Sequence, residues 1–309
     1  MMKQLLYKIF EDRRVGRALE NTGQDDPILR VGWEDLIPLI TMKFGYLSRG
    51  DTKRRPAGSS ESYPLVIPRF IHIHKVLYTV VDTPAKIVNL VDALADLPVM
   101  PPSLYVDLEG VNLCRHGSIS IIQIYVLPND HTYLVDVHSL AEAAFSTRSH
   151  DKRTLREIME SSAVPKVFFD VRNDSDALYS HFGVGLNGVH DLQLMELATR
   201  RPPRGYVSGL RKCIQREVQM TAAELHTWKV TKEKSLNLFE PGRGGSYEVF
   251  NIRPLSDDIL KYCIQDVRLL PKLWVAYYPK LMPIWAKRVE LSRKRQDHIV
   301  TISGISTKR

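Results

Sequence analysis

Cysteine is scarce in this 309-residue chain, and long hydrophobic runs are missing. The three cysteines, Cys114, Cys213 and Cys263, lie far apart and form no Cys-x-x-Cys pair. This spacing argues against a disulfide framework and against a structural zinc site. No apolar run approaches the roughly 18 residues that span a bilayer, so we expect no membrane partner.

The amino-terminal stretch at residues 1–19 also lacks the features of a targeting segment. It has no continuous apolar centre, which a signal peptide needs. Glu11 and Asp12 interrupt it, whereas transit peptides are poor in acids. We therefore expect an intracellular protein of the nucleus or the cytoplasm.

The composition is that of a soluble globular protein, with 44% hydrophobic and 25% charged residues. Lysine and arginine number 43 against 35 aspartates and glutamates, which gives a net charge of +8. Such an excess favours a polyanionic partner such as nucleic acid.

Composition divides the chain into three regions. Residues 1–62 are an N-terminal extension of unknown role that ends in a linker rich in glycine, serine, proline and charge. Residues 63–283 form the predicted main domain, and residues 284–309 a basic C-terminal tail.

Within the main domain, short apolar runs with turn-rich joints give way to strands that alternate with helices. This order predicts an α/β protein with a mixed sheet covered by helices. The predicted strands are residues 76–83, 104–110, 118–126, 131–137, 166–170 and 188–192. The predicted helices include residues 84–97, 154–161, 174–183, 193–200 and 256–281.

The strand LYVDLEG carries two acids, Asp107 and Glu109, in an apolar setting. Residues two apart in a strand point to the same face, so the two carboxylates repel each other there. Taken alone, the pair is explained more simply by a solvent-exposed edge face, and a bound cation is the alternative.

Two further acids strengthen the case for a cation. Asp174 lies where a buried strand passes into a helix, and Asp266 lies on the late helix, one turn after Tyr262. Carboxylate oxygens suit Mg²⁺ or Mn²⁺, whereas zinc more often recruits histidine or cysteine. A pair of such ions is a recurring device for displacement at phosphorus.

The chain resembles the DEDDy group of 3′-to-5′ exonucleases, the domain of RNase D, Werner-type and Egalitarian-like proteins. The likeness covers residues 78–280 and rests on four stretches in family order: DLE, DVRNDSDALYSHFG, RPL and YCIQDV. Within that group it is most similar to fungal 3′-5′ exonuclease domain proteins. The resemblance implies a ribonuclease H-like mixed five-stranded sheet flanked by helices, and an exonuclease domain over residues 63–283.

The resemblance also implies a role for each site residue. Asp107 would bridge two divalent cations, Mg²⁺ or Mn²⁺, and Glu109 and Asp266 would bind the ion on the nucleophile side. Asp174 would act partly through water, and Tyr262 would orient the attacking water. Together these residues form the predicted catalytic and metal site.

Several neighbouring acids are alternatives or supports in this scheme. Asp170 and Asp176 are the alternatives to Asp174, although Asp170 fits a structural bond at the strand end and Asp176 a solvated helix face. Asp191 corresponds to an aspartate of the relatives and is expected to be a supporting acid. Phe169 stands where many relatives have histidine, so we assign it no contact.

Substrate contacts are assigned to Arg253, His116 and Tyr247. Arg253 belongs to the RPL stretch, and His116 follows the first acid pair in a turn, where an ordinary turn histidine is the alternative. Tyr247, with Phe250, would stack a terminal base or else pack in the core.

Other polar residues have simpler explanations. Gln123 matches a glutamine of the relatives but is left off the catalytic set, because a polar residue in a sheet often bonds neighbouring backbone. His72 and His74 share one strand face without a third ligand and are taken as surface residues. A cluster of basic residues binds phosphates or forms a solvated face: Arg204, Arg211, Lys212, Lys229, Lys232 and Lys234.

The sequence therefore predicts a metal-dependent 3′-to-5′ exonuclease that acts on nucleic acid with a free 3′ end, RNA somewhat ahead of DNA. The alternative is a protein of the same fold that binds nucleic acid or acts as a scaffold with little or no turnover. The complete set of acids and the tyrosine favour the enzyme.

Overall fold

The computed structural model describes residues 76–202 and 204–305, with side chains up to residue 283. Residues 76–200 and the described residues from Ser208 onward form one compact unit. The predictions for residues 1–62, and those for His72 and His74, lie outside the described residues.

A mixed sheet of six strands forms the centre of this unit, in the order β1-β4-β3-β2-β5-β6. Strands β2, β3 and β4 pair antiparallel, whereas β1 with β4, β2 with β5, and β5 with β6 pair parallel. The strands are β1 (Leu77–Val81), β2 (Leu104–Glu109), β3 (Ile121–Val126), β4 (His131–Asp136), β5 (Lys166–Phe168) and β6 (Val189–Asp191).

The predicted mixed sheet flanked by helices is confirmed, and all six apolar runs predicted as strands join it, one more than the five strands that the family resemblance implies. Five strands, β2 to β6, form a sheet on their own, and β1 adds to its edge by pairing with β4. The apolar run that forms β1 is visible in the sequence, but its place at an edge depends on pairing with residues more than 50 positions away.

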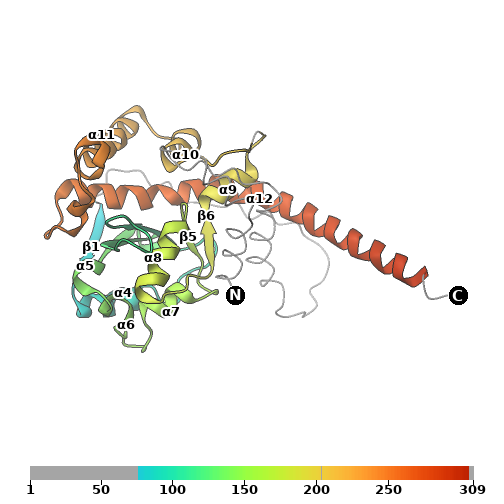
Figure 1. The fold of residues 1–309 in the computed structure, drawn as a ribbon, viewed down its shortest axis with the longest axis horizontal. Helices are drawn as coiled ribbons and strands as arrows, with labels where there is room; N and C mark the ends of the chain where they lie inside the picture. Colours follow the sequence, from blue (N-terminus) through green and yellow to red (C-terminus); the bar gives the residue numbers. More distant parts are fainter. Residues whose placement is uncertain (1–75, 203, 306–309) are drawn as a thin grey trace. The chain divides into compact units, whose positions relative to one another are not determined.

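One face of the sheet is covered by short helices, and Figure 1 shows α4, α6 and α7 together on that side. Thr83 caps the beginning of α4, which has Pro84 in its first turn. Thr154 and Glu157 form a capping box at the beginning of α7. These helices are α4 (Pro84–Ala93), α5 (Val137–Leu140), α6 (Ala143–Ser146), α7 (Leu155–Glu160) and α8 (Arg172–Phe182). Their apolar sides meet alternate residues of β2 and β3, Val106 and Ile124 among them.

The other face packs against the long helix α12, with α10 and α11 beyond it (Figure 1). Ile121 and Leu134 of the sheet meet Phe250 and Cys263 in this second core. The remaining helical elements after β6 are α9 (Leu192–Thr199), α10 (Leu210–Glu217), α11 (Ala222–Phe239), the 3-10 turns η3 (Pro241–Arg243) and η4 (Tyr247–Asn251), and α12 (Asp257–Ile305). A further 3-10 turn, η2 (Leu127–Asn129), joins β3 to β4.

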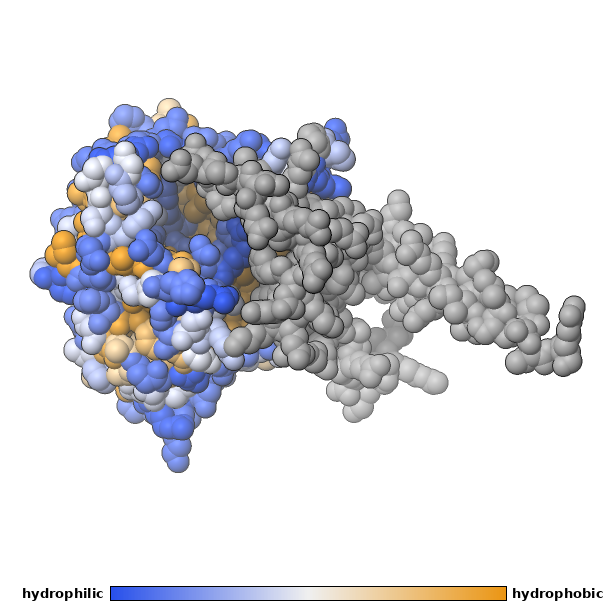
Figure 2. All heavy atoms as spheres, in the orientation of Figure 1, coloured by the Kyte–Doolittle hydropathy of each residue, from blue (hydrophilic) through white to orange (hydrophobic). Residues whose placement is uncertain are grey.

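Helix α12 is longer than the sequence pattern predicted. It continues through Pro271, Pro279 and Pro283 and reaches Ile305, so it extends into the segment expected to be a basic tail. Among the described residues, no helix combines the length and apolarity needed to cross a membrane. On the face shown in Figure 2, hydrophobic residues form scattered groups among hydrophilic ones.

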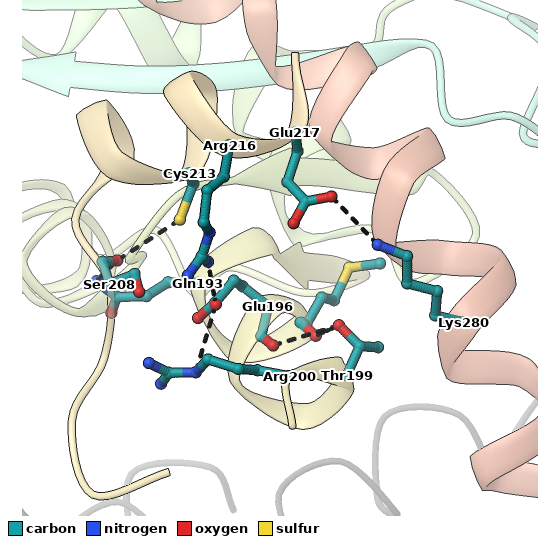
Figure 3. A network of polar contacts seen from close by, with 10 residues as sticks. Gln193, Glu196, Thr199, Arg200, Ser208, Cys213, Arg216, Glu217 and Lys280 are labelled. Atoms are coloured by element: carbon teal, nitrogen blue, oxygen red, sulfur yellow. Dashed lines mark hydrogen bonds and ion pairs between the residues drawn. The ribbon is translucent and has the colours of Figure 1, made fainter. Parts of the chain in front are cut away.

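A buried carboxylate ties α9 to α10. The Glu196 side chain is 2% exposed. Its Oε1 lies 2.5 Å from Nη2 of Arg216 and 3.4 Å from Nε of Arg200 (Figure 3). Nearby, Gln193 donates to the carbonyl of Ser208 at 3.2 Å. A buried charge is stable only when it is paired, so Glu196 fixes how these two helices approach each other.

We expect Glu196→Gln to lower the free energy of unfolding by about 1 to 3 kcal/mol, because it removes the buried charge that holds two arginines. Urea unfolding followed by circular dichroism measures this. Glu217→Gln is a matched control, since the Glu217–Lys280 pair is more exposed and its loss should cost under about 1 kcal/mol. Equal losses in the two variants would contradict the assignment.

Candidate active site

The first two acids lie on the sheet face that packs against α12. Asp107 pairs with Gln123 of β3, and Glu109 with Ile121, whose side chain is in the α12 core. The strand ends at Glu109, and at the next residue, Gly110, a Cβ would lie 2.0 Å from the carbonyl oxygen of Ser118. Only glycine fits there, so the chain turns away directly after the second acid.

Helix α12 brings Tyr262 and Asp266 to the same face from the other side. Both are buried, and Tyr262 packs on Phe239 and Phe250 with ring centroids 5.1 and 6.5 Å apart. Held in this way, the Tyr262 hydroxyl acts on Glu109, because it lowers the pKa of that acid against the larger, opposite effect of burial. The i, i+4 spacing predicted in the sequence therefore places both side chains at the acid pair.

Three carboxylates converge at this point. One oxygen from each of Asp107, Glu109 and Asp266 lies within 4.8 Å of the others. Asp174 is outside that set, but it is buried and the charges of Asp107 and Glu109 raise its pKa, so it lies within their field. The structure thus brings three of the four predicted acids into direct proximity and places the fourth beside them.

Asp174 reaches the site because a neighbouring acid shapes the turn between β5 and α8. Oδ1 of Asp191 accepts from the Asp170 amide at 3.1 Å, and Oδ2 accepts from the Val171 amide at 3.1 Å. The same Oδ1 caps α9 by accepting from Gln193 at 2.9 Å. Asp170 itself has φ 62°, a left-handed conformation that these bonds stabilise. Asp191 is therefore a supporting acid in this structure.

The two alternatives to Asp174 are paired elsewhere. Asp170 binds the Arg172 guanidinium through both oxygens, at 2.6 and 2.7 Å. Asp176 binds Arg115 of the loop after β2, at 3.0 and 2.7 Å, and so anchors that loop to α8. We expected Asp176 to be solvated on the helix face, but it forms this ion pair.

The electrostatics of the cluster favour a bound cation. Burial, and then the charge of Asp266, raise the pKa of Asp107 to about 7. Burial and the charge of Asp107 hold the pKa of Glu109 well above its usual range. Oδ1 of Asp266 is buried without a hydrogen-bond partner. A hard divalent cation such as Mg²⁺ or Mn²⁺ would satisfy that oxygen and relieve the repulsion, so the donor set fits such an ion.

Sequence reasoning missed the cation that the protein itself supplies. Lys232 of α11 lies with its ammonium nitrogen 2.5 Å from Oδ2 of Asp266 and 4.4 Å from the centroid of the Tyr262 ring. Attraction to Asp266 raises the pKa of Lys232 against the opposing effect of burial. The sequence showed Lys232 only as one of several basic residues, because nothing local distinguishes it from Lys229 or Lys234.

Arg253 has a full set of protein partners. Its guanidinium donates to both oxygens of Asp136, at 2.5 and 2.7 Å, and to the carbonyls of Phe250 and Ile252. Asp136 is buried, and although burial opposes it, the bond from Arg253 lowers the pKa of this acid. In the structure, Arg253 joins the segment before α12 to the end of β4.

The other two substrate-contact candidates lie differently. Tyr247 stacks on Phe239, with 6.1 Å between the ring centroids. Burial, the charge of Glu240 and the charge of Glu109 all raise the pKa of Tyr247, so this residue lies near the acidic site. His116 is exposed in the loop after β2. Gln123 is fully buried opposite Asp107, and neither polar atom of its amide has a hydrogen-bond partner among the described residues, so the expected bond to neighbouring backbone is not formed.

We expect Asp191→Ala to lower the free energy of unfolding by about 2 to 4 kcal/mol, because it removes a helix cap and the acceptors of the turn before α8. Asp191→Asn should lower the free energy of unfolding by less, since it keeps one acceptor oxygen. Urea unfolding of the two variants measures the difference. Equal stability of Asp191→Ala and the wild type would contradict this role.

We expect Arg253→Met to lower the free energy of unfolding by about 2 to 4 kcal/mol at neutral pH, because it leaves the buried Asp136 without its partner. Arg253 lowers the pKa of Asp136 in the folded state, so the stability that it confers is present above pH 4 or so and is lost as pH falls through the folded pKa. The difference between variant and wild type should therefore shrink on acidification. Urea midpoints between about pH 3 and 7 measure it, and Lys86→Met, at the exposed pair with Asp82, is the control.

Comparisons with known proteins agree with this geometry. A family model described as 3′-5′ exonuclease matches residues 78–281. The human piRNA biogenesis protein EXD1 is 30% identical over 182 residues, which are 58% of this chain and 33% of that protein. The mouse protein of the same name is 29% identical over 174 residues, 54% of this chain and 28% of that one. The chain thus spans about a third of the length of these relatives.

Solved structures show the same fold. RNase D of Trypanosoma brucei in complex with RNA U12 has a TM-score of 0.51 and 25% identity, covering 66% of this chain and 63% of that one. The GMP complex of that enzyme gives a TM-score of 0.52 at 24% identity, covering 65% and 57%. The match of the family model extends over more than half of the chain and includes every acid of the site. The chain belongs to the 3′-5′ exonuclease family.

Proposed function

We propose that the protein is a metal-dependent 3′-to-5′ exonuclease, which hydrolyses phosphodiester bonds at the 3′ end of nucleic acid. One observation carries the proposal. Three carboxylates from β2 and α12 converge within 4.8 Å, and the Tyr262 hydroxyl lies close enough to one of them, Glu109, to lower its pKa. This is a built site for divalent cations beside a hydroxyl that can orient water, in a chain of an exonuclease family.

Each residue has a defined part in the proposed reaction. Asp107, Glu109 and Asp266 would hold divalent cations, with Asp174 beside them. Tyr262, fixed by its aromatic neighbours, would orient the attacking water. The water oxygen bonds to phosphorus, and the bond from phosphorus to the departing 3′ oxygen breaks, which releases a nucleoside 5′-monophosphate.

Mg²⁺ or Mn²⁺, two per site, is the proposed cofactor. Bound at the carboxylates, the ions would acidify water and stabilise the charge that develops on the departing oxygen. The oxygen-only ligand set among these four acids supports this choice over zinc. The number and identity of the ions are part of the proposal.

RNA is the favoured substrate class. The support comes from relatives: the similar Trypanosoma brucei RNase D was solved with RNA U12, and the EXD1 proteins are named for piRNA biogenesis. His116, Tyr247 and Arg253 remain proposed substrate contacts. A closer kinship with fungal exonuclease domain proteins is likewise a prediction.

The test is a panel of 5′-labelled RNA and DNA strands, incubated with Mn²⁺, Mg²⁺ or EDTA. We expect stepwise shortening with either ion and none with EDTA. Asp107→Asn should reduce the rate by about a thousandfold or more while the protein stays folded, because the substitution removes a ligand charge and not a packing contact. Asp151→Asn, at an exposed acid that pairs with Arg153, is the control and should stay active.

Two outcomes would decide against the proposal. Full activity of Asp107→Asn would show that the acidic cluster is not the catalytic site. Retention of oligonucleotides without any shortening by the wild type would instead support the alternative, a nucleic-acid-binding or scaffold protein on the same fold.

A further inference from the structure

The acidic site contains a lysine that the proposed reaction does not use. Lys232 is carried by α11, whereas the acids come from β2, α8 and α12. Its side chain is only 14% exposed, and its ammonium group makes its ion pair with Asp266. Lysine is seldom buried without a paired charge, so this contact is what allows Lys232 to lie there.

The position of Lys232 balances the charge of the cluster. Its ammonium group lies against Asp266 and over the ring of Tyr262. The charge of Lys232 also lowers the pKa of Asp107 and Glu109, opposite in sign to the effects of burial and of the other acids. Lys232 thus does for these carboxylates what a bound cation would do.

The same position brings Lys232 into conflict with a bound cation. A divalent ion on a carboxylate lies roughly 2 to 2.5 Å from the oxygen, and the lysine nitrogen is 2.5 Å from Oδ2 of Asp266. An ion on Oδ2 would lie at most about 5 Å from the ammonium group, and an ion on the unpartnered Oδ1 at most about 7 Å from it. Two positive charges so close, with little water between them, repel strongly.

We propose that Lys232 is the internal counter-ion of the acidic site and that a divalent cation has to displace it from Asp266 in order to bind there. Lys232 neutralises the carboxylates before a cation binds, and it sets the cation concentration at which the site fills. Its long, flexible side chain can move toward solvent when the cation enters. The inference rests on the proposed function in one respect, that these acids are cation ligands.

Binding of Mn²⁺ alone tests this inference. We expect Lys232→Met, stripped with EDTA and titrated with MnCl₂ in a calorimeter, to bind Mn²⁺ about tenfold or more tightly than the wild type. A single charge at this range changes the affinity of a carboxylate for a proton by a factor of about 10 to 1000. Lys232→Arg keeps the charge and should bind as weakly as the wild type. Lys234→Met, at an exposed lysine of the same helix, should change nothing.

The wild type provides a second readout. If Mn²⁺ displaces Lys232, acetylation of this lysine by an amine-reactive reagent, followed by mass spectrometry, should become faster when Mn²⁺ is added. This measurement does not depend on the folding of any variant. Slower or unchanged acetylation, or equal or weaker binding of Mn²⁺ by Lys232→Met, would overturn the inference.

The two proposals fail separately. Neither measurement contains nucleic acid, so a chain without nuclease activity can still show the tighter binding of Lys232→Met, and only the proposed function would then be lost. Conversely, an active nuclease in which Lys232→Met binds Mn²⁺ no more tightly would remove the counter-ion role alone.

Discussion

Mutual repulsion between buried carboxylates is the constraint on which the site depends. One oxygen from each of Asp107, Glu109 and Asp266 lies within 4.8 Å of the others; Asp266 is buried and the other two are half-buried, and loss of water raises the pKa of Asp107 and Glu109. Such a cluster is stable only where opposite charge is close at hand. Lys232 supplies part of that charge, and the geometry of the remaining oxygens suits a divalent cation.

The scaffold around the cluster is organised to hold it against this repulsion. Phe239 and Phe250 pack on Tyr262 and fix one turn of α12 above β2. On the opposite side, Asp191 fixes the turn that delivers Asp174. Away from the acids, Arg253 joins β4 to the segment before α12. Rigid supports of this kind keep like charges at close distance, which a flexible chain would allow to separate.

The family match and the site geometry agree with each other and describe different features of the chain. The family model rests on sequence over residues 78–281, whereas the convergence of the carboxylates is a property of the fold. The relatives are about three times longer than the matched part, so their biological roles belong to those whole proteins. The convergence of acids, in contrast, is a feature of this chain itself.

The sequence by itself determined the local features. Alternation along LYVDLEG put Asp107 and Glu109 on one face, and the spacing of Tyr262 and Asp266 put both on one side of a helix, because strand and helix periods are set by the backbone. Pro84 likewise indicated where α4 begins, because proline fits the first turn of a helix.

Only the tertiary structure decided which distant residues meet. The ion pairs of Arg253 with Asp136 and of Arg115 with Asp176, and the place of β1 at the sheet edge, all join positions more than 50 residues apart. Lys232 meets Asp266 across a gap of 34 residues. No local periodicity encodes such contacts, because they depend on how whole elements pack. A lysine among several on α11 became part of the acidic site for that reason alone.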